Sequence, residues 1–136
     1  MTNMRIERDC LGEMEIPNDR YYGIQTIRNM KVSGAAGFPV VAYPDMHKAL
    51  CQIKKACAKA NAEIGAMKPE IAQAIAAACA KVIAGGYEKE FPLDMWQGGG
   101  YTCVNMNVNE VIGNLANEIL PCHKGQGMVH RNAHVN

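Results

Sequence analysis

The sequence predicts a mainly α-helical fold, a single small helical domain with short extended segments near its N-terminus, on three observations. Apolar residues recur at helical spacing in three segments between residues 46 and 120. Proline or glycine stands where these segments begin or end. Residues 1–22 show no helical period. The predicted domain of 136 residues has an extended or loop region with a short helix (1–45), three main helices (46–120) and an irregular tail (121–136).

The region before residue 46 predicts short, irregular elements. Residues 5–7 and 13–16 alternate polar and apolar side chains, which is typical of short extended pieces, and residues 11–12 predict a turn between them. Proline, asparagine and aspartate at the start of residues 17–26 predict a short helix there. The glycines and prolines of residues 33–44 predict a loop.

Each of the three main helices is predicted to bury one apolar face. The first starts at residues 44–45 and ends at Gly65, the second runs from Pro69 to the glycines 85–86, and the third ends before Pro121. The three faces consist, in order, of Met46, Leu50, Ile53, Cys57, Ala60 and Ile64; of Ile71, Ile75, Ala78, Cys79, Val82 and Ile83; and of Val104, Val108, Val111, Ile112, Leu115 and Ile119.

The composition excludes several classes of protein. A hydrophobic share of 49% and a net charge of +1 indicate an ordinary globular domain without a nucleic-acid or membrane partner. The N-terminus resembles no signal peptide, and no apolar run reaches transmembrane length. The six cysteines lack C-x-x-C spacing, and Cys51, Cys57 and Cys79 are predicted to be small buried residues of helices. A reduced, cytoplasmic protein without cofactor or metal is therefore expected.

One segment predicts a binding site. Three glycines, residues 98–100, lead directly into the third helix, where unpaired N–H groups and the helix dipole favour an anion. Thr102 adds a hydroxyl donor at this helix start, which suits a carboxylate or phosphate. The alternative is an ordinary N-cap threonine after a glycine loop.

The asparagines of the third helix can be interpreted in two ways. Asn105 and Asn109 share one face, while Asn107 and Asn114 lie elsewhere on the helix. Because asparagine is a poor helix former, their number suggests polar groups that are satisfied inside a larger assembly. A solvated helix face is the alternative.

The histidines of the tail do not predict a metal site. His130 and His134 are four residues apart, but no glutamate follows His130 as it does in a metalloprotease helix. Together with His123 they are predicted to be loop histidines in solvent.

These segments resemble the aspartase/fumarase superfamily over essentially the whole chain. Residues 5–9 and 11–12, and then the run Ile-Pro-Asn-Asp-Arg-Tyr-Tyr-Gly-Ile-Gln-Thr-Ile-Arg at 16–28, are similar to the family's opening. The double tyrosine is the form of the aspartate ammonia-lyase branch, since fumarases typically have another pair there. Residues 91–99 and 104–112, with Thr102 between them, resemble its most diagnostic N-terminal block, and residues 134–136 resemble the start of its second block.

The resemblance implies an enzyme that converts L-aspartate to fumarate and ammonia as a homotetramer built around a long helical bundle. A base removes the proton next to one carboxylate, and hydroxyl and backbone donors stabilise the charge that develops there. The base is expected in a later part of the family's chain, so none is assigned here, and residues 1–136 alone are expected to be inactive. The resemblance and the helix-start pattern place substrate-binding residues at Gly100, Tyr101, Thr102, Cys103 and Asn105.

Departures from the family pattern leave alternatives open. The family usually has Ala or Ser where Gly100 stands, Gly where Tyr101 stands, and Ser or Gln where Cys103 stands. A secondary carboxylate site of fumarases matches here at His130 and Asn132, but not at the positions that follow each of them. The alternatives to an aspartate ammonia-lyase are a fumarase or another fumarate-forming lyase, and a non-catalytic helical assembly module.

Overall fold

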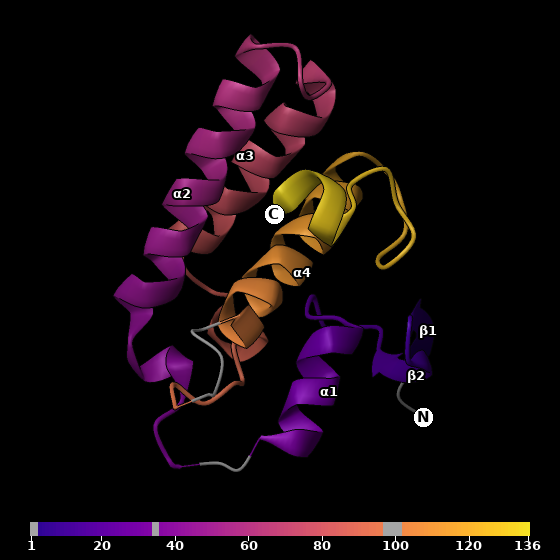
Figure 1. Ribbon diagram of the computed structural model, residues 1–136, viewed down its shortest axis with the longest axis vertical. Helices are drawn as coiled ribbons and strands as arrows, with labels where there is room; N and C mark the ends of the chain where they lie inside the picture. The colour runs from indigo at the N-terminus through magenta and orange to yellow at the C-terminus, as the bar shows by residue number, and fades with distance from the viewer. Residues whose placement is uncertain (1–2, 34–35, 97–101) are drawn as a thin grey trace.

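The computed structural model describes residues 3–33, 36–96 and 102–136. Helices α2 (Pro44–Glu63) and α3 (Pro69–Ala84) lie side by side, and α4 (Thr102–Ile119) packs against them (Figure 1). The other described elements are β1 (Met4–Asp9), β2 (Gly12–Pro17), α1 (Ile24–Val32) and the short turns η1 (Val40–Ala42), η2 (Glu88–Glu90) and η3 (Arg131–Val135). The predicted fold class, mainly helical with short extended segments near the N-terminus, is therefore confirmed.

The hydrophobic core is built from α3 and α4, whose predicted apolar faces are confirmed. Ile83 and Ile119, near the ends of these faces, are half-buried. The buried members of the two faces are Ile71, Ile75, Ala78, Cys79, Val82, Val104, Val108, Val111, Ile112 and Leu115. Burial of these stripes makes the α3–α4 contact an apolar contribution to stability.

The face predicted for α2 is wrong by one residue in phase. The helix buries His47, Cys51, Lys54 and Ala58, which have the same helical spacing as the predicted stripe. Ile53 is 56% exposed, and Cys57, predicted to be buried, is exposed as well. The tertiary structure orients α2 so that the ring of His47 stacks on Phe91 at 4.4 Å between centroids.

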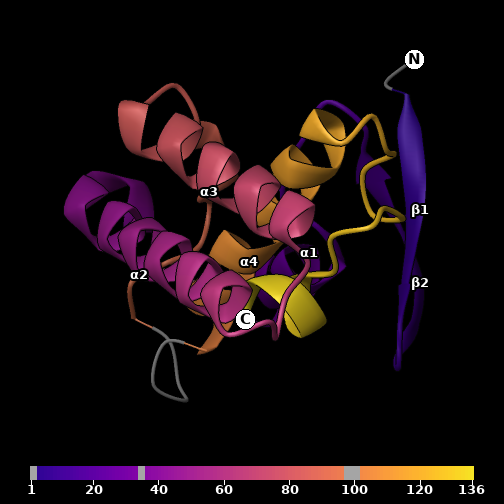
Figure 2. The ribbon, with the colours of Figure 1, turned by 90° about the horizontal axis from the view of Figure 1, so that it is seen from above.

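The N-terminal hairpin agrees with the prediction. Strands β1 and β2 pair antiparallel, with Arg5 opposite Ile16 and Arg8 opposite Glu13. Gly12 follows the turn with a φ of 112°, a conformation that glycine adopts without steric cost. Figures 1 and 2 place this hairpin on the side of the molecule away from α2 and α3.

The predicted helix at residues 17–26 is wrong in its position, because α1 begins at Ile24 and ends at Val32. Residues 18–20 form a turn instead, in which Arg20 N–H donates to Pro17 O at 3.1 Å. Gly23, at the N-cap, provides no side-chain cap for α1. Carboxylates from distant parts of the chain bind the first N–H groups of this helix.

The tail after α4 was expected to be irregular, but it ends in one turn of π-helix, η3. Val129 and Val135 from this tail are buried in the core. In Figure 1 the turn lies against α4, near α2. None of the helices in the described ranges combines the length and the apolar character needed to cross a membrane.

Candidate functional site

The start of α4, where the sequence predicts an anion site, is described from Thr102 onward. Thr102 is the first residue of α4 and is exposed. Gly100 and Tyr101, two of the predicted binding residues, lie outside the described residues. The structure therefore places three of the five predicted positions: Thr102, Cys103 and Asn105.

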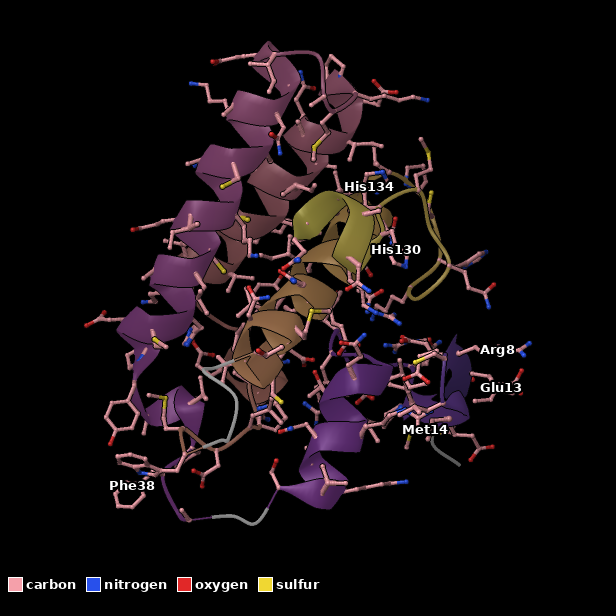
Figure 3. All side chains as sticks on the ribbon, in the orientation of Figure 1. Arg8, Glu13, Met14, Phe38, His130 and His134 are labelled. Carbon is pink, nitrogen blue, oxygen red and sulfur yellow. The ribbon has the colours of Figure 1, made fainter. Side chains whose placement is uncertain are left out.

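Thr102 and Cys103 line a cavity of about 630 Å³ between the N-terminal hairpin, α1 and α4. Apolar side chains from all three elements contribute to it, among them Met14 of the hairpin, which is labelled in Figure 3. The full lining is Asp9, Cys10, Leu11, Met14, Gln25, Arg28, Asn29, Lys31, Val32, Thr102, Cys103 and Met106. A cavity of this volume lies within the usual range for small-molecule sites.

Polar groups in this cavity are already engaged with one another. Asn29 Nδ2 donates to Cys103 Sγ at 2.8 Å, and Arg28 binds both carboxylate oxygens of Asp9 at 2.8 Å each. The Arg28 guanidinium lowers the pKa of the Asp9 carboxyl below its usual value. Asn29 Oδ1 is buried and has no hydrogen-bond partner in the described part of the chain. The arginine of the cavity is thus neutralised by Asp9.

Asn105 contacts a different part of the molecule from Cys103. Its Nδ2 donates to Asn136 Oδ1 at 3.0 Å, next to Lys54 of α2. The predicted binding residues therefore divide between two sides of α4, with Cys103 toward α1 and Asn105 toward the C-terminal turn. The sequence places them near each other along one helix, but only the packing of α1 and η3 shows this division.

Buried asparagines of α4 anchor other segments of the same chain, so the solvated face offered as an alternative is wrong for them. Asn107 Nδ2 donates to Glu90 O at 2.9 Å, and Asn114 Nδ2 donates to Tyr21 O at 2.8 Å. Asn117 Nδ2 donates to Val129 O at 3.0 Å, and its Oδ1 accepts from Val129 N–H at 2.8 Å. These amides satisfy backbone groups that would otherwise be buried without a partner.

Glu110 of α4 is the centre of a buried polar network that the sequence did not indicate. Its carboxylate accepts N–H groups of Gly23 at 2.9 Å, Gln25 at 2.9 Å and Thr26 at 3.1 Å, and the Thr26 hydroxyl at 2.7 Å. Burial raises the pKa of Glu110, and the hydrogen bond from Thr26 opposes that effect. Glu110 thus caps the first turn of α1 from another helix.

Two further carboxylates extend this network. Glu90 Oε2 accepts the N–H groups of Tyr21 at 2.6 Å and Tyr22 at 3.2 Å. Glu7 Oε2 accepts Ile24 N–H at 3.1 Å, and a Cβ added to Gly23 would lie 2.7 Å from the same oxygen. Close approach of the carboxylates to the chain therefore explains why a glycine precedes α1. We assign this network to the stability of the domain.

The tail residues His130 and Asn132, predicted as a secondary carboxylate site, contact each other. His130 Nδ1 accepts N–H groups from Asn132 and Ala133 at 3.2 Å each, and so caps η3. His130 N–H in turn donates to His134 Nδ1 at 2.9 Å; both rings lie on this turn in Figure 3. Since Nδ1 of His130 accepts from the backbone, the neutral ring carries its proton on Nε2, and this N–H is the group that could donate to a carboxylate while the cap is kept.

We expect the cap at His130 to fail at acidic pH. Burial lowers the pKa of His130 below its usual value of 6.5. The neutral ring is therefore the form stabilised by folding, so this contribution is fully present above 6.5 and is lost as the pH falls through the lowered pKa. Hydrogen-exchange protection of the Asn132 and Ala133 amides, measured against pH, should decline in that window.

Two variants complete the pH test. His130→Asn, which keeps a side-chain acceptor that does not titrate, should retain protection through the same window. His123→Asn changes an exposed histidine of the same tail and should leave the decline as it is in the unchanged chain. Protection of both amides that does not change with pH would contradict the cap.

Two of the cysteines that were predicted to be buried lie in the core. Cys51 and Cys79 are buried as predicted, and contact with Cys79 together with burial raises the pKa of the Cys51 thiol. Within residues 3–33, 36–96 and 102–136, no group of three or more His, Cys, Asp or Glu side chains could hold a metal ion.

The fold is that of a family of lyases. A family model described as a lyase matches residues 12–136. The chain belongs to this family, the aspartase/fumarase superfamily, and corresponds to its N-terminal domain.

Relatives of known name agree with this assignment. The aspartate ammonia-lyase of Pseudomonas aeruginosa is 42% identical over 137 residues, covering 100% of this chain and 29% of that protein. The class II fumarate hydratase of Thermus aquaticus is 45% identical over 132 residues, covering 97% of this chain and 28% of that protein. The chain therefore spans less than a third of the length of these relatives.

A solved structure agrees as well. The cobalt-bound crystal structure of fumarate lyase:delta crystallin from Brucella melitensis superimposes with a TM-score of 0.95 at 39% identity. The match covers 98% of this chain and 29% of that one. The likeness at this level of identity confirms that the N-terminal hairpin and α1–α4 have the arrangement of the family.

Proposed function

We propose that this chain is the N-terminal domain of an aspartate ammonia-lyase, which eliminates ammonia from L-aspartate to give fumarate. The observation that carries the proposal is the start of α4, where Thr102 is exposed at the end of a cavity and follows three glycines in the sequence. Relatives that are 42% and 44% identical to this chain are named aspartate ammonia-lyases. The double tyrosine at Tyr21 and Tyr22 supports the same branch.

The role of this chain in the reaction is to bind one carboxylate of the substrate. Removal of the proton next to that carboxylate places developing negative charge on its oxygens, and donors at a helix start stabilise such charge. Thr102, the first residue of α4, supplies a hydroxyl there. We assign no catalytic base to the described residues. By itself the chain would bind the substrate but would not convert it to product.

The assembly follows from the same proposal. We infer that the complete enzyme is a homotetramer in which helices of several subunits surround the substrate. The exposed apolar side chains of Ile53 in α2 and of Ile64, directly after its end, suit such a contact. The six free cysteines fit a reducing compartment, so we place the enzyme in the cytoplasm.

A second function has its own support. The class II fumarate hydratases of Thermus aquaticus and Halobacterium salinarum are 45% and 46% identical to this chain. Addition of water to fumarate gives L-malate, which is a four-carbon dicarboxylate like L-aspartate. The residues at the start of α4 suit either reaction, because both place charge on a carboxylate.

The two functions are separated by a direct assay. The complete natural product of the gene that encodes this chain should release fumarate from L-aspartate, with L-malate assayed in parallel. A clear preference for L-malate would replace the first proposal by the second. No fumarate from either compound would contradict both, and release by the 136-residue chain alone would contradict the absence of a base.

A further inference from the structure

Lys54 of α2 is a buried cation without an acidic partner. It is 8% exposed, and its ammonium donates to Asn136 Oδ1 at 3.4 Å. No carboxylate of residues 3–33, 36–96 and 102–136 lies within 4.0 Å of Lys54 Nζ. Burial lowers the pKa of Lys54 accordingly. A buried ammonium is unfavourable unless an anion or a set of acceptors compensates it.

Three donors converge on one oxygen at this position. Asn105 Nδ2 and Asn109 Nδ2 each lie 3.0 Å from Asn136 Oδ1, in addition to Lys54 Nζ. An amide oxygen is neutral, so it compensates the charge of the Lys54 ammonium only weakly. A carboxylate oxygen, which carries charge and accepts strong hydrogen bonds from ammonium and amide groups, matches this set better.

The position of Asn136 allows a carboxylate oxygen to replace its Oδ1. Asn136 is exposed and follows the single turn η3, whereas Lys54 and Asn109 are held in the long helices α2 and α4. Figures 1 and 2 show the C-terminal turn lying beside α4 at the surface. Asn105 is in the first turn of α4, so the dipole of that helix adds to the positive potential.

We propose that Lys54, Asn105 and Asn109 form a carboxylate-binding site, in which a carboxylate oxygen of the substrate takes the place of Asn136 Oδ1. The inference rests on the proposed function for the identity of the substrate as a four-carbon dicarboxylate. It assigns Lys54 as the residue that supplies positive charge to the binding site. Asn136 is then the group that satisfies these donors until the ligand arrives.

The test uses the 136-residue chain with fumarate as the probe and its uncharged diamide as the control ligand. Binding is followed by the side-chain amide resonances of Asn105 and Asn109. Lys54→Met should weaken fumarate binding by roughly 10- to 100-fold, the range for loss of one hydrogen bond to a charged group. Lys55→Met, a change at the exposed neighbour of Lys54, should leave the affinity unaltered.

Asn136→Ala tests the exchange itself. It removes the competing oxygen and should tighten fumarate binding, whereas a site in which Asn136 contacts the ligand would bind more weakly. Lys54→Met removes a buried charge and keeps an apolar stem, so its thermal midpoint should be unchanged or higher. Equal affinity for fumarate of the Lys54→Met variant and the unchanged chain would overturn the proposal. An equal loss of fumarate affinity in Lys54→Met and Lys55→Met would overturn it as well.

The complete gene product separates this inference from the proposed function. Turnover of L-aspartate with kcat and KM unaffected by Lys54→Met would refute the site and leave the function in place. Fumarate binding that depends on Lys54, in a gene product that acts on neither L-aspartate nor L-malate, would support the site and contradict the function.

Discussion

Thr102→Val in the complete gene product is expected to lower kcat for L-aspartate by roughly 100- to 1,000-fold, the usual effect of removing one donor from an oxyanion site. Valine has nearly the same shape as threonine but lacks the hydroxyl. Thr102 is exposed at the first residue of α4, so the substitution removes no side chain from the core. Steady-state rates of fumarate formation measure the effect.

Thr102→Ser is the matched control, because it keeps the hydroxyl at the helix start. Its kcat should remain within a few-fold of the unchanged enzyme, since serine is also a good residue at a helix start. A kcat for Thr102→Val close to that of the unchanged enzyme would contradict the proposed role of the hydroxyl. Equal losses for valine and serine would point to packing at this position.

Glu110→Ala is expected to lower the free energy of unfolding of the chain by about 3–5 kcal/mol, the range for removing one partner from a buried charged network. The substitution leaves three backbone N–H groups of residues 23–26 and the Thr26 hydroxyl without their acceptor. It also leaves Arg131, whose Nε lies 3.8 Å from Glu110 Oε1, without this carboxylate. Urea unfolding followed by circular dichroism measures the change.

Glu63→Ala provides the comparison for that measurement. Glu63 is exposed at the C-terminal end of α2, where a negative charge is unfavourable to the helix dipole. Its removal should leave stability unchanged or slightly increased. A loss for Glu110→Ala no larger than that for Glu63→Ala would show that the carboxylate does not hold α1 in place.

Much of the fold could be predicted because it depends on neighbouring residues. The apolar stripes of α3 and α4 have the helical period, and their helices end at the proline and glycines that the sequence shows. The alternation in residues 5–7 and 13–16 likewise matches strands β1 and β2. Periodicity and helix-ending residues act within a few positions, so one sequence contains them completely.

The phase of α2 could not be predicted in the same way. Its sequence offers two adjacent stripes with the same spacing, one apolar and one containing His47 and Lys54. The apolar stripe is the natural choice for a core, but a buried face depends on what packs against it. Here Phe91 and Cys79 contact the stripe that contains His47 and Lys54, and Ile53 remains exposed.

The sequence by itself determined that the protein is mainly helical and that the start of α4 is a candidate site with Thr102 at its edge. The tertiary structure decided where α1 begins, because its first N–H groups are bound by Glu110, more than 80 residues away. It also decided that Asn105 lies with Lys54 and Asn136 while Cys103 faces α1. Helical period is a local property of the chain, whereas the partner of a buried polar group is set by packing between distant segments.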